Sequence, residues 1–508
     1  MKILVVGSGG REHAVCWKLA QSEKVDKIYC APGNAGIAGV AECVDIGAED
    51  IDGICRFAVE NKVDMAVIGP EVPLAMGITD ALSEKGVRVF GPNKKCSQLE
   101  ASKSFTKAFL ARHNIPTAGY KEFTDKQELL DAVGIYGYPM VIKADGLAAG
   151  KGVVIAENEA DAKKAVEEMM GARIFGDAGD KVVVEEYLTG VEASMLCFVD
   201  ENSIVPMESA QDYKRVFDGD KGPNTGGMGS YSPSLVFTPE LEKRIMDDIL
   251  LPTLKGFQED GLDFKGVLFV GLMLSADGPK VIEFNNRFGD PETQSVLMRL
   301  DSDLAEIFDA VIDNKLADID IKWKKETAVC VVLASGGYPG SYEKGKVISG
   351  LADVDDGVEV FHAGTAFAEG SGAIVTSGGR VLGITALGAT HDEARARAFA
   401  NAKRISFEGM HYRNDIGTVK LPRWITAHTG KQFSFSFSSG NSFPEDLTPY
   451  RLVVHCGGCM LNQREMETRA VRAAAQGIPY TNYGVLIAYL NGILGRSLTF
   501  LNALENTE

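Results

Sequence analysis

The stretch "VIKADGLAAGKGV", residues 141–153, joins an apolar run to a glycine-rich loop that carries a second lysine. Lys143 ends the apolar run, and a buried ammonium at that point needs an anionic partner. Three glycines give the following loop its flexibility, and Lys151 lies within it. The spacing is not that of G-x-x-x-x-G-K-[ST], so the stretch indicates a nucleotide-phosphate site of another class than the P-loop.

A second segment, "VVVEEYLTGVEAS" at residues 182–194, follows some forty residues later. It predicts a strand that ends in the paired acids Glu185 and Glu186. A hinge after such a strand can offer backbone groups to an adenine edge. A later acid such as Glu192 can hold ribose hydroxyls.

A third segment, "VIEFNNRFGDPE" at residues 281–292, supplies oxygen ligands. Glu283 and Asn285 are two residues apart on a predicted strand, so both point to the same face. Hard oxygen ligands on one face suit a Mg²⁺ ion that bridges ATP phosphates. Arg287 continues the same face and can bind a carboxylate or a phosphate bidentately.

Residues 1 to about 100 alternate strand and helix patterns. The apolar runs "KILVVG", "KIYCA", "MAVIGP" and "VRVFGP" predict four strands, with a helix at "GREHAVCWKLAQS". This rhythm predicts βαβ units and a parallel sheet. Downstream, "PMVIKADGLAAGKGVVIA" and "KVVVEEYLTGVEASMLCFVD" are each typical of a hairpin with a glycine-rich connection.

The turn "VVGSGGREHA" lies between the first strand and the first helix, where backbone N–H groups can meet an anion. Glu12 occupies the position of the third glycine of G-x-G-x-x-G, and the second strand ends without an acid for a ribose hydroxyl. The turn therefore favours a phosphate or sugar phosphate over NAD. A tight turn without a ligand is the alternative.

Length and charge exclude several classes of protein. A chain of 508 residues is too long for one core and predicts three or four domains. A net charge of −18 argues against a nucleic-acid partner or an anionic membrane surface. No run approaches the ~20 apolar residues of a membrane span, and the first residues show no signal-peptide pattern. Nine scattered cysteines predict a reducing, cytoplasmic location without a disulfide framework.

The order of these motifs resembles the ATP-grasp fold, and longer segments resemble the phosphoribosylamine–glycine ligase family of purine biosynthesis over residues 1–416. These segments are "GSGGREHA", "GPEVPLAMGITD", "LEASKSF", "IKADGLAAGKGV", "QDYKRVFDGDKGPNTGGMGSYSP", "EFNNRFGDPETQ" and "ASGGYPGSY". The resemblance implies that ATP, glycine and 5-phosphoribosylamine give glycinamide ribonucleotide, ADP and phosphate through a glycyl phosphate. A ligase of this fold with another acid or amine is the alternative.

The resemblance also implies an α/β fold with four parts. We expect an N-terminal parallel-sheet substrate domain at residues 1–101 and an ATP-grasp domain at 102–322. A small β-rich C-terminal ligase domain is expected at 323–416, and an extra α/β tail at 417–508. The ligase part is expected to be monomeric.

The resemblance to the ligase family also implies roles for individual residues of this chain. The predicted metal ligands for Mg²⁺ or Mn²⁺ are Glu283 and Asn285. The predicted ATP-binding residues are Lys103, Lys143, Ala148, Gly150, Gly152, Glu185, Glu186, Tyr187, Leu188 and Glu192. The predicted catalytic residues are Lys143, Asp212, Lys214 and Arg287. The residues predicted to bind glycine and phosphoribosylamine are Gly9, Gly10, Arg11, Glu12, Asn224, Thr225, Gly226, Arg287 and Asp290. Tyr213 and Asn286 replace the histidine and cysteine that the family usually has.

The tail resembles the C-terminal end of the iron-only hydrogenase maturation GTPase. The shared segments are "FPEDL", "HCGGCMLN" and "PYTNYGVLIAYL". That end builds the oligomer of its family, and its HCxxC supplies two cysteines of an iron–sulfur cluster, with a third from an upstream C-x-H. Here Gly409 stands at the position of that third cysteine, His411 follows it, and the chain has no P-loop.

Several interpretations of His455, Cys456 and Cys459 therefore remain open. The cysteines are inert thiols in a homo-oligomerisation module, part of an incomplete metal or iron–sulfur site, or a redox dithiol. A fusion without a physiological role is a further alternative. As a competing function for the whole chain, the tail is a metal-cluster scaffold and the ligase part is vestigial. Within the tail, "QFSFSFS" and "YRLVVHC" predict strands, and "NQREMETRAVRAAAQG" and "YGVLIAYLNGIL" predict helices.

Overall fold

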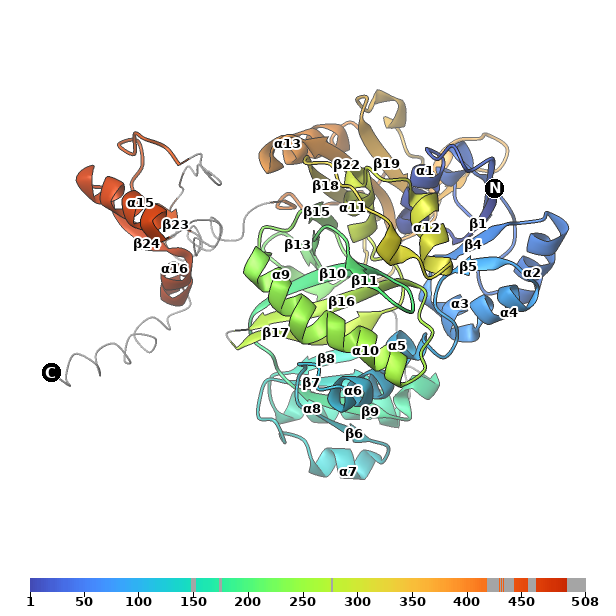
Figure 1. The fold of residues 1–508 in the computed structure, drawn as a ribbon, viewed down its shortest axis with the longest axis horizontal. Coiled ribbons are helices and arrows are strands. Elements are labelled where there is room, and N and C mark those ends of the chain that lie inside the picture. The colour runs from blue at the N-terminus through green and yellow to red at the C-terminus, as the bar shows by residue number, and fades with distance from the viewer. Residues whose placement is uncertain are drawn as a thin grey trace. The chain divides into compact units, whose positions relative to one another are not determined.

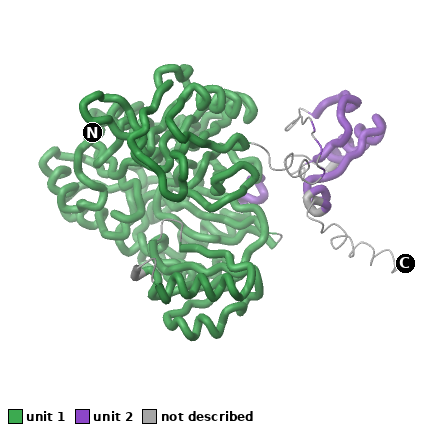
Figure 2. The backbone as a smooth tube through the Cα atoms, turned by 180° about the vertical axis from the view of Figure 1, so that it is seen from behind, with its two compact units in different colours: residues 1–236, 244–417 green, residues 237–243, 418–508 purple. Residues whose placement is uncertain are grey.

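The computed structural model describes residues 1–147, 152–172, 176–275, 277–417, 443–455 and 463–490, together with residues 429, 431 and 433. The chain forms two compact units, residues 1–236 with 244–417 and residues 237–243 with 418–508 (Figure 2). No helix within the described ranges is long and apolar enough to cross a membrane.

The N-terminal segment folds into a parallel sheet in the order β3-β2-β1-β4-β5. Its strands are β1 (Lys2–Gly7), β2 (Lys27–Pro32), β3 (Glu42–Cys43), β4 (Met65–Ile68) and β5 (Arg88–Phe90). The four predicted strands are confirmed, and β3 is a short addition. The helices of this segment are α1 (Gly10–Leu19), α2 (Ile51–Glu60), α3 (Glu71–Met76) and α4 (Ile78–Glu84). The central strand β1 is an unbroken apolar run because helices cover both faces of such a sheet.

Two antiparallel four-stranded sheets, the two middle sheets in chain order, follow in the first unit; that of β10 and β16 is central in Figure 1, and that of β6 to β9 lies at its lower end. One has the order β6-β9-β7-β8, with strands β6 (Tyr120–Phe123), β9 (Val182–Glu186), β7 (Met140–Ala144) and β8 (Val153–Ala156). The other has the order β11-β10-β16-β17, with strands β11 (Ile204–Pro206), β10 (Val191–Val199), β16 (Gly266–Ser275) and β17 (Gly278–Asn285). The helices between residues 98 and 312 are α5 (Gln98–Ala101), α6 (Lys103–Arg112), α7 (Lys126–Asp131), α8 (Glu159–Val166), α9 (Pro239–Ile245), α10 (Leu251–Glu259), α11 (Glu292–Arg299) and α12 (Leu304–Ile312). Residues 239–243 of α9 belong to the second unit.

One of the two predicted hairpins is confirmed and the other is wrong. Strands β7 and β8 pair as predicted, but β9 and β10 belong to different sheets. Strand β10 instead pairs with β16 from Val191 to Val199, a longer antiparallel ladder than a hairpin with the five-residue β9 allows. Gly190 makes the change of sheet possible, because it has a φ of +157° and a Cβ there would lie 2.3 Å from the Leu274 carbonyl oxygen.

A third sheet, in the order β12-β15-β18-β22-β19, forms the C-terminal part of the ligase region. Its strands are β12 (Gln211–Asp212), β15 (Gly229–Ser232), β18 (Thr327–Ala334), β22 (Arg380–Gly388) and β19 (Val358–His362). Two hairpins, β13 (Arg215–Phe217) with β14 (Lys221–Asn224) and β20 (Thr365–Phe367) with β21 (Ile374–Thr376), and the helix α13 (His391–Ala402) complete this part. Strands β12 and β15 precede residue 322, so the sheet combines strands from both sides of that position.

A buried arginine fastens the β13–β14 hairpin to the end of the ligase region. The Arg413 side chain is fully buried, and its Nε lies 2.7 Å from Asp415 Oδ1. Its Nη2 lies 3.0 Å from Asp220 Oδ1, and its Nη1 donates to the Arg215 carbonyl at 2.9 Å. Asp415 also accepts a hydrogen bond from the Gly219 backbone N–H. The hairpin that follows the predicted catalytic residues is therefore held by a paired buried charge.

The second unit contains a βαβα arrangement. Strands β23 (Val453–His455) and β24 (Tyr480–Asn482) are parallel, and the helices are α15 (Gln463–Ala475) and α16 (Tyr483–Leu490). The strand and the two helices predicted for these residues are confirmed, and Gly477 follows α15 with a φ of +69°. The strand predicted at "QFSFSFS" lies, except for Phe433, outside the described residues.

We expect the Arg413→Ala variant to lose about 3–5 kcal/mol of stability, because it leaves the Asp415 and Asp220 carboxylates without their buried partner. The urea midpoint followed by circular dichroism measures this loss. Arg404→Ala is the matched control, since the exposed Arg404–Asp355 pair contributes under about 1 kcal/mol. Equal midpoints for the two variants would contradict the anchoring role of Arg413.

Candidate ATP and substrate site

A carboxylate between two lysines lies at the end of β9. Glu185 Oε1 is 2.8 Å from Lys143 Nζ on β7, and Glu185 Oε2 is 2.9 Å from Lys107 Nζ on α6. All three side chains are at most 7% exposed. Burial lowers the pKa of Lys107 to about 8, although Glu185 opposes the shift. The anionic partner that Lys143 requires is therefore Glu185.

Lys107 was not among the predicted residues. It lies four positions after Lys103 on α6, and side chains four apart lie on one face of a helix. This spacing is the signal in the sequence that could have identified Lys107.

The start of α6 is tied to the glycine-rich loop. Lys103 Nζ donates to the Gly146 carbonyl at 2.7 Å, and Asp145 accepts from the Ser104 hydroxyl at 2.6 Å. Burial lowers the pKa of Lys103, while Glu283 opposes this shift. Farther along, the Gly152 carbonyl accepts from the Ala144 backbone N–H at 2.9 Å, closing the β7–β8 hairpin. Ala148 and Gly150 lie outside the described residues.

Glu283 lies beside a β-bulge in β17. It is opposite Gly271 of β16, and the register shifts there so that the extra residue is Ile282. The Ile282 carbonyl accepts a long hydrogen bond from Lys143 Nζ at 3.4 Å. A Cβ at position 271 would lie 3.1 Å from Glu283 Cγ, so Gly271 leaves room for that side chain. Bulges of this kind re-aim side chains at functional sites.

The charge of Glu283 is set by its neighbours. Burial alone would raise its pKa, but Lys214, Lys143 and Lys103 together hold that pKa below its usual value. A side-chain hydrogen bond to Asn285 acts in the same direction. An ionised carboxylate and an amide oxygen therefore lie side by side, and this donor set fits Mg²⁺ or Mn²⁺.

Arg287 joins three separate segments. Its Nη2 bonds to Asn285 Oδ1 at 3.3 Å and lies 3.0 Å from Glu100 Oε1 on α5. Its Nε lies 3.4 Å from Glu71 Oε2 on α3. Burial alone would lower the pKa of Arg287, but the negative charges of Glu100 and Glu71 outweigh this effect and hold that pKa above its usual value. The two acids were missed by the sequence analysis, because nothing local in the chain links residues 71 and 100 to residue 287.

The N-terminal glycine turn is closed by its own glutamate. Glu12 Oε2 accepts from the Gly9 backbone N–H at 2.6 Å, as in a capping box, and Glu12 Oε1 lies 2.6 Å from Arg11 Nε. Arg11 Nη1 donates to the Phe288 carbonyl at 3.1 Å. Glu12 therefore fixes Gly9 and Arg11, and Arg11 ties the turn, in which Gly10 begins α1, to the loop after β17.

Asp290 lies where three regions meet. It is 3.0 Å from Arg380 Nη2 on β22, and Arg380 Nη1 donates to the Gly226 carbonyl at 2.6 Å. A Cβ at Gly9 would lie 3.5 Å from Asp290 Oδ2. Burial would raise the pKa of Asp290, but Arg380 and Arg11 keep it below its usual value. The predicted residues Gly9, Arg11, Gly226 and Asp290 are thus brought together, and Arg380 is an unpredicted member of the group.

Lys214 connects the ATP side to the substrate side. Its Nζ lies 3.7 Å from Glu192 Oε2, and its carbonyl accepts from the Thr225 hydroxyl at 2.8 Å. Burial would lower the pKa of Lys214, but Asp212, Glu192 and Glu283 raise it well above its usual value. Asn224, at the end of β14, is opposite Arg215 of β13.

The hinge between the two middle sheets contains the remaining predicted ATP residues. Glu186 accepts from the Gly119 backbone N–H at 3.1 Å and lies 3.6 Å from Lys280 Nζ. Tyr187 is 41% exposed and Leu188 is half-buried. In the described part of the chain, neither Tyr187 nor Leu188 bonds through its side chain to another predicted site residue.

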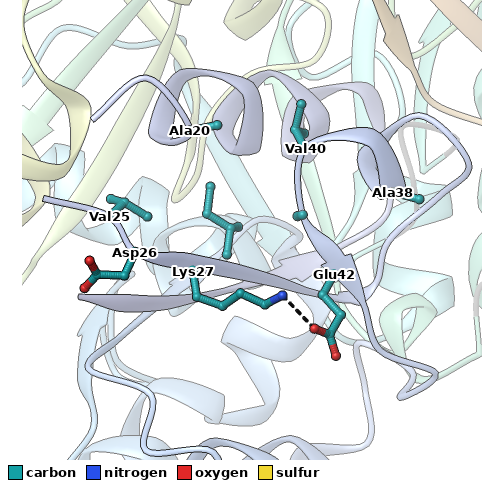
Figure 3. A pocket seen from close by; sticks show the side chains of 9 residues that line it. Ala20, Val25, Asp26, Lys27, Ala38, Val40 and Glu42 are labelled. Carbon is teal, nitrogen blue, oxygen red and sulfur yellow. Dashed lines mark ion pairs between the residues drawn. The ribbon is translucent and has the colours of Figure 1, made fainter. Parts of the chain in front are cut away.

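A separate pocket of about 470 Å³ lies at the edge of the N-terminal sheet (Figure 3). Lys27 and Glu42, two of the residues that line it, form an ion pair of 2.7 Å, and both side chains are exposed. The residues that line it are Ala20, Val25, Asp26, Lys27, Ile28, Ala38, Val40, Ala41 and Glu42. None of them is a predicted site residue, so this pocket is not the candidate site.

In the second unit, His455 is buried at the end of β23, opposite Asn482 of β24. Cys456 and Cys459 lie outside the described residues. The described ranges hold no group of three or more His, Cys, Asp or Glu side chains able to bind a metal ion. Gly409 has a φ of +75°, in a turn whose backbone lies against Gly336. That conformation favours glycine over cysteine at this position.

Comparison with known proteins decides the family. Three family models match the chain. The phosphoribosylglycinamide synthetase N domain matches residues 1–100, the ATP-grasp (A) domain residues 101–293, and the C domain residues 328–419. The phosphoribosylamine–glycine ligase of Vibrio vulnificus (strain CMCP6) is 52% identical over 427 residues, which are 83% of this chain and 99% of that protein. The chain belongs to the phosphoribosylamine–glycine ligase family. It is an ATP-dependent ligase of the ATP-grasp fold, as predicted.

Further relatives agree with this assignment. The phosphoribosylamine–glycine ligase of Caldanaerobacter subterraneus is 50% identical over 420 residues, 82% of this chain and 99% of that protein. The crystal structure of the ligase from Thermotoga maritima is 34% identical with a TM-score of 0.71, and the match covers 82% of this chain and 100% of that one. Biotin carboxylase from Campylobacter jejuni, at 14% identity and a TM-score of 0.65, covers 80% of this chain and 92% of that one and shares the fold alone.

The C-terminal part of the chain, which includes the tail, matches a second family. The hydrogen maturase F tetramerization domain matches residues 403–500, which confirms the predicted resemblance of the tail. This match overlaps the synthetase C domain over residues 403–419.

We expect Glu185→Gln to lower the thermal unfolding midpoint of the ligase, because Lys107 and Lys143 would then face each other without a buried counter-charge. Breaking such a buried pair costs about 3–5 kcal/mol. The neighbouring change Glu186→Gln removes a half-exposed contact with Lys280 and should cost under about 1 kcal/mol. Differential scanning calorimetry compares the two, and similar midpoints would show that Glu185 does not stabilise the cluster.

Proposed function

We propose that residues 1–417 ligate glycine to 5-phosphoribosylamine through a glycyl phosphate, giving glycinamide ribonucleotide, ADP and phosphate. The observation that carries this proposal is the ionised Glu283, which shares its surroundings with Lys103, Lys143 and Lys214. This cluster offers counter-charges for a polyphosphate beside a group suited to a divalent metal. Family membership supplies the substrates, and the step belongs to purine biosynthesis.

Metal and ATP would lie on the side of β17. Glu283 and Asn285 would hold Mg²⁺ or Mn²⁺, which when bound neutralises phosphoryl charge. Lys103 and Lys143 would contact the ATP phosphates. Because two lysines already engage Glu185, we assign to it the positioning of Lys143.

The adenosine would lie at the hinge. The backbone of Glu186, Tyr187 and Leu188 would face the adenine edge, and Glu192 would hold the ribose hydroxyls. The loop with Ala148, Gly150 and Gly152 would cover the phosphates and keep water from the acyl phosphate.

The chemistry needs charge neutralisation and alignment more than a covalent role for the protein. The glycine carboxylate oxygen attacks the γ-phosphorus of ATP, and the bond to the ADP oxygen breaks. The amine of phosphoribosylamine then attacks the carbonyl carbon, the carbon–oxygen bond to phosphate breaks, and the nitrogen gives up one proton to the departing phosphate. Lys214 and Arg287 would neutralise the negative charge that develops in both steps.

The phosphoribosylamine would bind between the glycine turn and the loop after β17. Gly9 and Gly10, at the N-terminus of α1, would receive its phosphate once the Gly9 N–H exchanges its bond to Glu12 for the phosphate; Arg11 lies beside them, paired with Glu12. Asp212, Asn224, Thr225, Gly226 and Asp290 would surround the glycine and the amine.

The test of this function is a coupled assay for ADP with freshly made phosphoribosylamine. We expect ADP release that depends on glycine, with serine, alanine and bicarbonate as control acids. Equal release with one of these acids would favour a ligase of different specificity.

We expect Glu283→Ala to abolish glycine-dependent ADP release and to weaken Mn²⁺ binding measured by electron paramagnetic resonance. Glu343→Ala, at an 81% exposed side chain, is the control and should keep wild-type values. Near-normal turnover of Glu283→Ala would refute the metal assignment.

For the tail we propose homo-oligomerisation with inert thiols, supported by the match to a tetramerization domain. Multi-angle light scattering of the full chain should give the mass of an oligomer, and a monomer would contradict the proposal. The Cys456→Ser/Cys459→Ser variant should ligate glycine at the wild-type rate. Visible absorbance after anaerobic iron–sulfur reconstitution that is lost in this variant would instead favour the scaffold alternative.

A further inference from the structure

Asn34 lies in the loop after β2 and joins the N-terminal glycine turn to the C-terminal sheet. Its Nδ2 donates to the Ser8 carbonyl of the turn at 2.8 Å. The same Nδ2 donates to the His362 carbonyl at 2.8 Å and, at a longer 3.3 Å, to the Ala363 carbonyl. His362 is the last residue of β19. One half-buried side chain therefore links two segments that are far apart in the sequence.

The oxygen of the same amide group fixes its orientation. Asn34 Oδ1 accepts from the backbone N–H groups of Gly36 and Ile37, both at 2.9 Å, where the short 3₁₀ helix Ile37–Gly39 begins. Because N–H groups face the oxygen and carbonyl groups face the nitrogen, only one orientation of the amide satisfies both sides. The two ends thus have separate tasks. The oxygen maintains the local loop, and the nitrogen makes the contacts with the turn and with the end of β19.

His13 of α1 holds the same end of β19. Its Nδ1 accepts from the His362 backbone N–H at 2.7 Å. Burial lowers the pKa of His13 to about 3, and the neighbouring His362 acts in the same direction, so the His13 ring is neutral near pH 7 and can accept this bond. Gly36 allows the close approach, because a Cβ at position 36 would lie 2.3 Å from Cγ of the His362 ring.

The residues after His362 connect this contact to the substrate side. A Cβ at Gly10 would lie 3.7 Å from Ala363 Cβ, so Ala363 stands against the glycine turn. The Gly364 N–H donates to the Arg380 carbonyl at 2.9 Å, and the Arg380 side chain pairs with Asp290. The glycine turn and the strand that carries Arg380 therefore share one support.

We propose that Asn34 is a positioning residue for phosphoribosylamine, whose Nδ2 contacts hold the glycine turn against the end of β19 and so keep Gly9 and Gly10 in place for the phosphate. Asn34 acts through the turn and touches no substrate. The inference rests on the proposed function, because that function assigns the phosphate to this turn. Its consequence is a reciprocal coupling: a phosphate that fixes the turn also fixes residues 362–364 through Asn34.

The Asn34→Asp variant tests the proposal in steady-state kinetics of the full chain. An aspartate keeps an oxygen for the N–H groups of residues 36 and 37, but it turns a second oxygen towards the carbonyls that Nδ2 now contacts. We expect the KM for phosphoribosylamine to rise about 10- to 100-fold, because the turn is no longer held in place. The KM values for ATP and glycine should stay at wild-type values. A merely structural role would not separate one substrate from the other two.

Asn93→Asp is the matched control. Asn93 Oδ1 also accepts a bond from the backbone N–H three residues later, that of Cys96, at 2.9 Å. Its Nδ2 donates only a long bond of 3.5 Å, to the Asp263 carbonyl. This variant makes the same chemical change without the contact to β19, and it should match the wild type for all three substrates.

Hydrogen–deuterium exchange measures the coupling itself, on the full chain with and without saturating glycinamide ribonucleotide, which carries the same phosphoribosyl group. In the wild type, the ligand should slow exchange in residues 7–12 and also in residues 358–364. In Asn34→Asp, the protection of residues 7–12 should remain at saturation, and that of residues 358–364 should be lost.

Protection of the turn alone in the wild type would overturn the proposal, and this result does not depend on whether the variant folds. An unchanged KM for phosphoribosylamine in Asn34→Asp, or an equal rise in all three KM values, would also overturn it. Wild-type protein without protection in either segment would instead refute the phosphate site on which the proposed function relies.

Discussion

The ion pair between Asp290 and Arg380 fixes the loop on which the whole site depends. This loop, residues 286–291, leaves β17 and leads into α11, and each region of the ligase binds it. Arg11 reaches its Phe288 carbonyl from the N-terminal turn, and Arg380 reaches it from the C-terminal sheet. One short loop therefore sets the distance between the predicted metal ligands and the predicted phosphoribosylamine site.

Charge compensation at the site is strictly local. The chain carries a net charge of −18, yet Lys103, Lys107, Lys143 and Lys214 gather in its ATP-grasp region. Buried charges persist only where partners offset the loss of hydration. Glu185 provides such a partner for two lysines. Glu283 stays ionised because the positive charges of Lys103, Lys143 and Lys214 act on it. The result is a local cluster of lysines inside an acidic protein.

Much of the fold and part of the site could be predicted from local patterns. Apolar runs gave the parallel N-terminal strands, and the i, i+2 spacing placed Glu283 and Asn285 together, because strand periodicity is a property of adjacent residues. The change of sheet at Gly190 and the bulge at Ile282 escaped prediction, since pairing with β16 decides both. Glu71, Glu100 and Arg380 were missed for a similar reason. Their partners lie far away in the sequence and meet them only after the sheets assemble.

The third sheet has a consequence for how such genes can recombine. Because β15 pairs with β18 across residue 322, a polypeptide cut there would have an unsatisfied sheet edge on each piece. The residues after position 322 therefore do not form a sheet of their own that could be moved to another protein. Among the described residues, Asn414, Ile416 and Gly417 form the last contacts of the ligase region with α13. A further segment can be joined after that point without breaking a strand pairing of this sheet, and the match to the synthetase C domain ends nearby, at residue 419.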